Sequence, residues 1–155
     1  MKIWIDADAC PVGIREIIFK ASERLKITTI LVANQAIKFP KSLYISQIQV
    51  AKGFDGADQY IVQELSSDDL VITADIPLAD LVVKKGGVAI SPRGELYNIQ
   101  SISEKLSYRN FNQMLREGGL IQGGPPQMQT TDKHKFAAMF DKQLNILLKK
   151  SATKN

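Results

Sequence analysis

The strongest constraint on the fold is an alternation of short apolar runs with helix-like stretches through the first hundred residues. The apolar runs are rich in Ile and Val and predict five strands, at 2–5, 28–33, 44–50, 70–73 and 88–91. Helices are expected between several of them, at 11–25, 55–66 and 77–85. Pro11 and Pro77 open two of these helices, and Gly86-Gly87 follows the last. Such alternation indicates an α/β fold with a mainly parallel sheet flanked by helices.

The rest of the chain predicts helices and no strands. Ser101 and Glu104 have the spacing of a capping box, which predicts a helix from 101 to about 117. Residues 118–127 contain four glycines and two prolines and are expected to form a loop. A last helix, from about 132 to 150, has one apolar face made of Phe136, Met139, Phe140, Leu144 and Leu147. We therefore expect one domain over 1–155, with a core of about 1–100 and a helical C-terminal extension of about 101–150.

The composition agrees with a folded domain without disulfides. The chain has 155 residues, of which 45% are hydrophobic and 23% charged, close to the average of globular proteins. Its one cysteine, Cys10, excludes an internal disulfide and a cysteine-rich zinc site. Asp6 interrupts the N-terminal apolar stretch too early for a signal peptide, and no apolar run approaches the ~18 residues of a membrane helix. These features predict a cytoplasmic protein without a membrane segment, and they leave its oligomeric state open.

Three aspartates follow predicted strands. Asp6 and Asp8 follow the first strand, and Asp75 follows the fourth. Because the carboxyl ends of parallel strands lie along one edge of a sheet, these carboxylates are expected to converge there. The alternative is that each aspartate caps the proline-initiated helix after it. Capping accounts less well for the Asp6–Asp8 pair, because one helix needs only one cap.

A fourth aspartate, Asp58, falls on the apolar stripe of a predicted helix. It shares this stripe with Phe54, Ile61, Val62 and Leu65. A carboxylate on a core-facing position needs a metal, a cation or several hydrogen-bond donors as its partner. The alternative is a surface aspartate stabilised by the dipole of the first helical turn.

The four aspartates together predict a metal site made of oxygen ligands. Asp6, Asp8, Asp58 and Asp75 would suit Mg²⁺ or Mn²⁺ rather than Zn²⁺. Two such ions, about 3.5–4 Å apart, are the usual device for hydrolysing phosphodiesters. His134 is the only histidine, and the chain has neither a G-x-S-x-G nor a Walker motif, so the sequence does not indicate triad or P-loop chemistry.

Positive charge is concentrated in the C-terminal third. Residues 1–100 contain 11 Lys and Arg against 12 Asp and Glu, whereas residues 101–155 contain 9 against 4. Lys135, Lys142 and Lys149 recur every seven residues and form one basic stripe on the last predicted helix. Such a stripe can follow a phosphate backbone, and its alternative is an ordinary solvated helix face.

Several sequence blocks resemble those of the bacterial YaiI/YqxD family, and the resemblance covers nearly the whole chain. The blocks are DADACPV (6–12), VAN (32–34), GADQYIV (56–62), TADIPLAD (73–80), SPRGELY (91–97), REGG (116–119), GGPP (123–126) and TDKHKFAAMFDKQL (131–144). This resemblance implies a PIN-like fold, related to metal-dependent nucleases. It also implies that Asp6, Asp8, Asp58 and Asp75 are the metal-binding and catalytic acids. Asn34, in the VAN block, would lie at the same edge.

These expectations combine into a functional hypothesis with one alternative. The chain is expected to hydrolyse phosphodiesters, in RNA, with Mg²⁺ or Mn²⁺; Asn34 and Arg93 would position phosphate, and Lys135 and Lys142 would contact the strand. The alternative is a non-catalytic PIN-like module that binds a nucleotide, RNA or a protein partner. Two departures from the family pattern matter. Gln59-Tyr60 replaces a more acidic and aromatic stretch, and Gln122 replaces a basic residue before the double glycine of the GGPP block.

Overall fold

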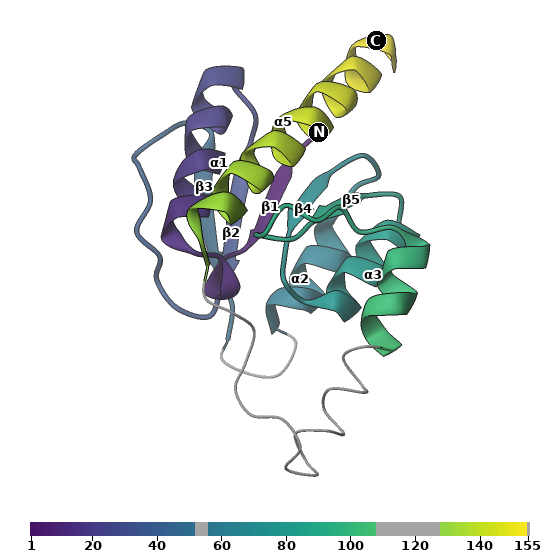
Figure 1. Cartoon of the computed structure of the whole chain (residues 1–155). Coiled ribbons are helices and arrows are strands. Elements are labelled where there is room, and N and C mark those ends of the chain that lie inside the picture. The colour runs from purple at the N-terminus through teal and green to yellow at the C-terminus, as the bar shows by residue number, and fades with distance from the viewer. Residues whose placement is uncertain (52–55, 108–127, 155) are drawn as a thin grey trace.

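The computed structural model describes residues 1–51, 56–107 and 128–154 (Figure 1). Five strands form one sheet with the order β3-β2-β1-β4-β5, and every neighbouring pair is parallel. The strands are β1 (Ile3–Asp6), β2 (Thr29–Ala33), β3 (Ile45–Gln49), β4 (Leu70–Ile72) and β5 (Val88–Ile90). The predicted α/β class and parallel sheet are therefore confirmed.

The helices also lie close to their predicted positions. They are η1 (Ala7–Ala9), α1 (Val12–Leu25), α2 (Gly56–Glu64), α3 (Ile76–Lys84), a helix at 99–107 and α5 (Thr130–Lys154). The predicted capping box was wrong in register, because the helix is capped by Asn98 and not by Ser101. Asn98 Oδ1 accepts a hydrogen bond from the Ser101 backbone N–H at 2.8 Å, and the Asn98 backbone N–H donates one to Ser101 Oγ at 2.9 Å. No helix within the described ranges is long and apolar enough to span a membrane.

The two faces of the sheet are covered by different helices, as Figure 1 shows. Ile3 and Ile5 of β1 pack into a core with α1 and α5, whereas Trp4 between them packs into a second core with α2, α3 and the 99–107 helix. This alternation follows from the two-residue period of a strand, and it explains why the strands are apolar on both faces. The Trp4 ring also contacts Tyr60 of α2 edge to face, with 6.2 Å between ring centroids.

Helix α5 is a structural part of the first core. Its apolar face is the predicted one: Phe136, Phe140, Leu144 and Leu147 are buried against the sheet and α1. The turn after β5 touches the start of α5 so closely that a Cβ on Gly94 would lie 2.6 Å from the backbone of Lys135 and Phe136. Gly94 also has a φ of 85°, which favours glycine. The segment that the sequence predicts as a C-terminal extension thus covers one face of the sheet.

A buried carboxylate joins β1 and β4 at the N-terminal edge of the sheet. Asp69, directly before β4, accepts hydrogen bonds from the Lys2 backbone N–H at 2.9 Å, Trp4 Nε1 at 3.1 Å and the Ser66 backbone N–H at 3.0 Å. These three donors satisfy a carboxylate that is only 2% exposed. Asp69 therefore has a structural role at this edge.

Candidate acidic site at the C-terminal edge of the sheet

The strand order places a topological switch point between the carboxyl ends of β1 and β4. The chain passes from β1 to β2 and β3 on one side and later to β4 and β5 on the other, so the connections diverge at β1 and β4. Ligands of parallel α/β proteins bind at such switch points, outside the carboxyl ends of the strands. Asp6 is the last residue of β1, and Asp75 lies three residues after the end of β4. Two predicted site residues therefore lie at this switch point.

Asp6 is a buried carboxylate with other carboxylates nearby. It is 8% exposed, and its Oδ2 accepts a hydrogen bond from Thr73 Oγ1 at 2.9 Å. Burial raises the pKa of Asp6 above its ordinary value; the Thr73 hydrogen bond opposes this shift, and the negative charges of Asp75 and Asp8 add to it. The three acids are close enough to interact electrostatically, so a cation placed among them would relieve their repulsion.

Asp75 caps a helix and also belongs to this group of acids. Its Oδ1 accepts from the Leu78 backbone N–H at 3.0 Å and caps α3. The capping alternative is thus confirmed for Asp75. It fails for Asp6, whose side chain makes no capping hydrogen bond to the short helix η1. The Thr73 hydroxyl joins the two acids, because it donates to Asp6 and accepts from the Asp75 backbone N–H at 2.9 Å.

Asp8 extends the acidic group towards β2. Its Oδ2 accepts from the Asn34 backbone N–H at 2.8 Å. Asn34 follows β2 and lies at the same edge, as the family resemblance implies. Asp6, Asp8 and Asp75 are called the acidic site below. Each uses one carboxylate oxygen in a hydrogen bond, Oδ2 in Asp6 and Asp8 and Oδ1 in Asp75. The second oxygen of each has no hydrogen bond among the described residues.

The donor set of the acidic site suits a hard cation. Its side chains offer only carboxylate oxygens, which Mg²⁺ and Mn²⁺ prefer. The nearby Cys10 is a poor ligand, because burial raises the pKa of its thiol to about 12 and keeps it protonated at neutral pH. Within the described ranges, no three Asp, Glu, His or Cys side chains are already arranged closely enough to hold a metal ion. The donor chemistry of these three acids fits a metal ion.

Asp58 lies in the first turn of α2. It is half-buried and lines a groove of about 470 Å³ with Pro77, Leu78 and Leu81 of α3. Ile61 and Leu65, from the same predicted stripe, are buried, whereas Phe54 lies outside the described residues. The charges that raise the pKa of Asp6 are those of Asp75 and Asp8. The role of Asp58 as a metal ligand stays a prediction.

On the β5 side, a pocket of about 490 Å³ adjoins the acidic site. Its lining includes Ala9, Ala74, Arg93, Tyr97 and Lys105. Arg93 Nη1 forms an ion pair with Asp132 Oδ2 of α5 at 3.1 Å. Lys105 pairs with Glu95 and lies over the Tyr97 ring, with Nζ 5.9 Å from its centroid. Both cations therefore hold parts of the fold together beside the acidic site.

The basic residues near the start and middle of α5 are exposed: Lys133, Lys135 and Lys142, as expected of a surface stripe for the last two. The Lys133 side chain also reaches the start of α1, with its Nζ 2.7 Å from the position that a Cβ on Gly13 would take. The glycine-rich segment 118–127, together with all of REGG and GGPP, falls outside the described residues, and so does the predicted helix beyond 107.

Sequence reasoning missed the residue that organises the acidic site, Thr73. It is fully buried, and its backbone carbonyl accepts a 3.3 Å hydrogen bond from the Tyr97 hydroxyl. Burial, followed by the charges of Glu95 and Asp75, raises the pKa of Tyr97 to about 12. The available signal was a threonine directly after an apolar strand and two residues before a strand-end aspartate.

The fold and the site define a class of protein: an α/β domain with a parallel sheet and clustered carboxylates at its topological switch point. A family model described as "Uncharacterized BCR, YaiI/YqxD family" matches residues 4–146, and the chain belongs to this family. No solved structure is significantly similar to the chain.

Bacterial relatives match over almost their full length. A UPF0178 protein of Shewanella baltica (strain OS223) is 54% identical over 143 residues, which cover 92% of this chain and 95% of the relative. One from Geobacter metallireducens is 52% identical over 149 residues and 96% of both chains. One from Colwellia psychrerythraea is 52% identical over 142 residues, or 92% of this chain and 94% of the relative.

Proposed function

We propose that this protein is a phosphodiesterase that uses Mg²⁺ or Mn²⁺ to hydrolyse RNA at the acidic site. The observation that carries the proposal is the position of Asp6: a buried carboxylate at the switch point, bound by one hydroxyl and close to two further acids. A purely structural carboxylate in this chain, Asp69, has three donors instead. The resemblance to a PIN-like family supports the same chemistry.

Each residue of the acidic site has its own role in this proposal. Asp6, Asp8 and Asp75 would hold the metal, with Asp58 as a further candidate ligand. Thr73 would orient Asp6 and Asp75 through its hydroxyl, and the Asn34 backbone orients Asp8. A bound Mg²⁺ or Mn²⁺ supplies an activated water and stabilises charge on the phosphate. This chemistry needs no histidine side chain.

A second function has one observation in its favour. No three candidate ligands are already gathered within the described ranges, and this favours a non-catalytic module that binds a nucleotide, RNA or a protein partner at this edge. Such a module needs the pockets beside the acids and does not need the acids to converge. The two functions differ in whether Asp6 is required for turnover.

The test is cleavage of a labelled single-stranded RNA in Mn²⁺, Mg²⁺ or EDTA. Wild type should cleave with either metal and not with EDTA, and Asp6→Asn should lower the rate at least a hundredfold, because it removes a metal ligand. Mn²⁺ at 100 times its Kd should also stabilise wild type by about 2.7 kcal/mol, and Asp6→Asn should lose this gain. Asp141→Asn, on the exposed side of α5, is the matched control. RNA binding without cleavage would favour the non-catalytic module, and cleavage that survives in Asp6→Asn would contradict the site.

A further inference from the structure

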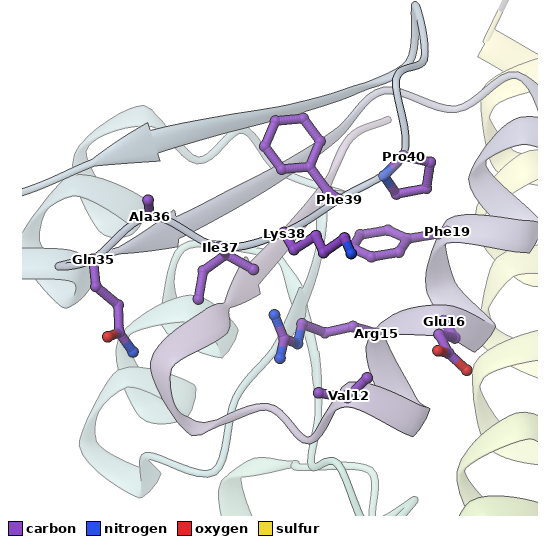
Figure 2. Close-up of a pocket in the computed structure, with 10 residues that line it drawn as sticks. All are labelled: Val12, Arg15, Glu16, Phe19, Gln35, Ala36, Ile37, Lys38, Phe39 and Pro40. Atoms are coloured by element: carbon purple, nitrogen blue, oxygen red, sulfur yellow. The ribbon is translucent and has the colours of Figure 1, made fainter.

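A further hollow, of about 630 Å³, lies between α1 and the segment that follows β2 (Figure 2). We call it the Arg15 pocket. Its lining residues are Val12, Arg15, Glu16 and Phe19 of α1 with Gln35, Ala36, Ile37, Lys38, Phe39 and Pro40. The volume is typical of sites for small molecules, and mostly apolar walls with a few polar groups are typical of them too.

The outer wall of this pocket is held in place by the sheet. Gln47 of β3 accepts a hydrogen bond from the Ile37 backbone N–H at 2.9 Å and donates one to the Gln35 carbonyl at 2.6 Å. These two bonds fix the 35–37 stretch against a strand. The pocket is therefore preformed, which lowers the entropic cost of binding a ligand there.

Arg15 supplies the polar group that points into the pocket. Its Nε is buried, and no acceptor for it exists among the described residues. Figure 2 shows the Arg15 guanidinium directed towards the 35–40 segment and the Glu16 carboxylate directed away from it. A buried guanidinium N–H without a partner is costly, and its planar fork matches the oxygens of a phosphate. Lys38 on the facing wall adds a second positive charge.

The two cations that line the described pocket on the β5 side of the acidic site are already paired. Arg93 contacts Asp132, and Lys105 contacts Glu95. A strand that approaches the acidic site needs a cation to hold its phosphates, because the carboxylates repel them. Arg15 has no ion-pair partner among the described residues, so its guanidinium group is available for this role.

The Arg15 pocket adjoins the acidic site. Asn34, whose N–H binds Asp8, directly precedes the wall that begins at Gln35. Cys10 lies within electrostatic reach of both places, since Arg15 and Asp6 both affect the pKa of its thiol. One RNA strand can therefore contact both.

We propose that the Arg15 pocket binds one nucleotide of the RNA strand. Its phosphate is held by Arg15, and its base lies against the apolar wall formed by Ile37 and Phe39. This rests on the proposed function, which supplies RNA as the ligand, and it adds the place where the strand is held next to the acidic site. Base contacts with aromatic side chains tolerate any sequence, so the pocket predicts binding with little sequence preference.

The test is the anisotropy of a fluorescent single-stranded oligoribonucleotide in EDTA at low salt, where no cleavage occurs. Arg15→Gln should raise Kd roughly tenfold to a hundredfold, as expected for losing a charged hydrogen bond to phosphate. It should also reduce the log–log salt slope by about 0.7. Phe39→Ala should raise Kd about tenfold by removing a base contact. Arg24→Gln, the same change in the last turn of α1, should leave Kd within about twofold.

Competition and cleavage complete the test. 5′-AMP should displace the RNA at a lower concentration than inorganic phosphate, because it also offers a base; equal displacement would overturn the base contact. An unchanged Kd in Arg15→Gln, or no binding by wild type, would overturn the pocket as the phosphate site.

The same variants separate this proposal from the proposed function. If Arg15→Gln binds normally while Asp6→Asn loses metal-dependent cleavage, only the proposed function is supported. If Arg15→Gln loses RNA binding and wild type cleaves no RNA, only the proposal that the Arg15 pocket binds RNA is supported. A far-UV spectrum and an unfolding midpoint matching wild type check that each variant folds.

Discussion

Asp69 and Asp6 are both buried carboxylates next to β1, yet they lie at opposite edges of the sheet and in opposite environments. Asp69, at the N-terminal edge, accepts from two backbone N–H groups and the Trp4 indole. Asp6, at the C-terminal edge, has the Thr73 hydroxyl and two acidic neighbours that help to raise its pKa. The first arrangement stabilises the fold, and the second makes a negative charge costly until a cation arrives. Burial alone thus does not separate structural from functional acids; the neighbours of the carboxylate do.

The largest effect is expected for Asp69→Ala. The change leaves three donors without their acceptor, including the buried Trp4 indole, and should lower the free energy of unfolding by about 3 kcal/mol. Urea unfolding followed by tryptophan fluorescence measures this loss, and Asp141→Ala should stay within about 0.5 kcal/mol of wild type. A loss below about 1 kcal/mol would show that the N-terminal edge does not depend on Asp69.

Replacing aspartate by the isosteric asparagine at both edges of the sheet tests the comparison of Asp69 with Asp6 directly. Asp69→Asn should destabilise the metal-free protein, because an amide has one acceptor oxygen in place of two. Asp6→Asn should instead raise its stability by about 1 kcal/mol, because it removes a repelled charge and can keep the Thr73 hydrogen bond. The measurement is the free energy of unfolding in EDTA. Equal losses in both variants would contradict the assignment of Asp6 as a strained site residue.

Two substitutions of Asp75 distinguish the contribution of its helix cap to stability from the contribution of its negative charge. Asp75→Ala should cost about 1 kcal/mol in EDTA, because Leu78 N–H loses its cap. Asp75→Asn should cost little, since asparagine caps a helix about as well, and it relieves repulsion with Asp6. Thermal unfolding of both variants checks this, and a loss of equal size in each would mean that the charge itself is needed.

The smallest effect is a dependence on pH. Because the pKa of Asp6 is raised above its ordinary value of 3.8, ionised Asp6 lowers stability at neutral pH. This penalty is removed as pH falls through the raised pKa towards 3.8. The stability advantage of Asp6→Asn over wild type should therefore be largest near pH 7 and shrink as the pH approaches 4. An advantage that grows on acidification would mean that the pKa is shifted the other way.

The fold and part of the site could be predicted because their signals are local. Apolar runs with Pro and Gly at helix ends located the strands within one or two residues, and strand-end aspartates pointed to one edge of the sheet. The local signals at Thr73 and Arg15 are too common to single these residues out. A threonine after a strand and an arginine on a helix are common, and their roles depend on neighbours from other segments: Asp6 for Thr73, and the 35–40 wall for Arg15.

The sequence by itself determined the α/β class, the parallel strands and the apolar face of the last helix, because side-chain period and helix-end residues act within a few positions. Only the tertiary structure decided what covers that face, which acids share an environment and which cations have partners. Helix α5 packs on a sheet formed more than forty residues earlier, and Arg93 pairs with Asp132, 39 residues away. Burial and charge pairing depend on distances in space, and local sequence patterns do not encode those distances.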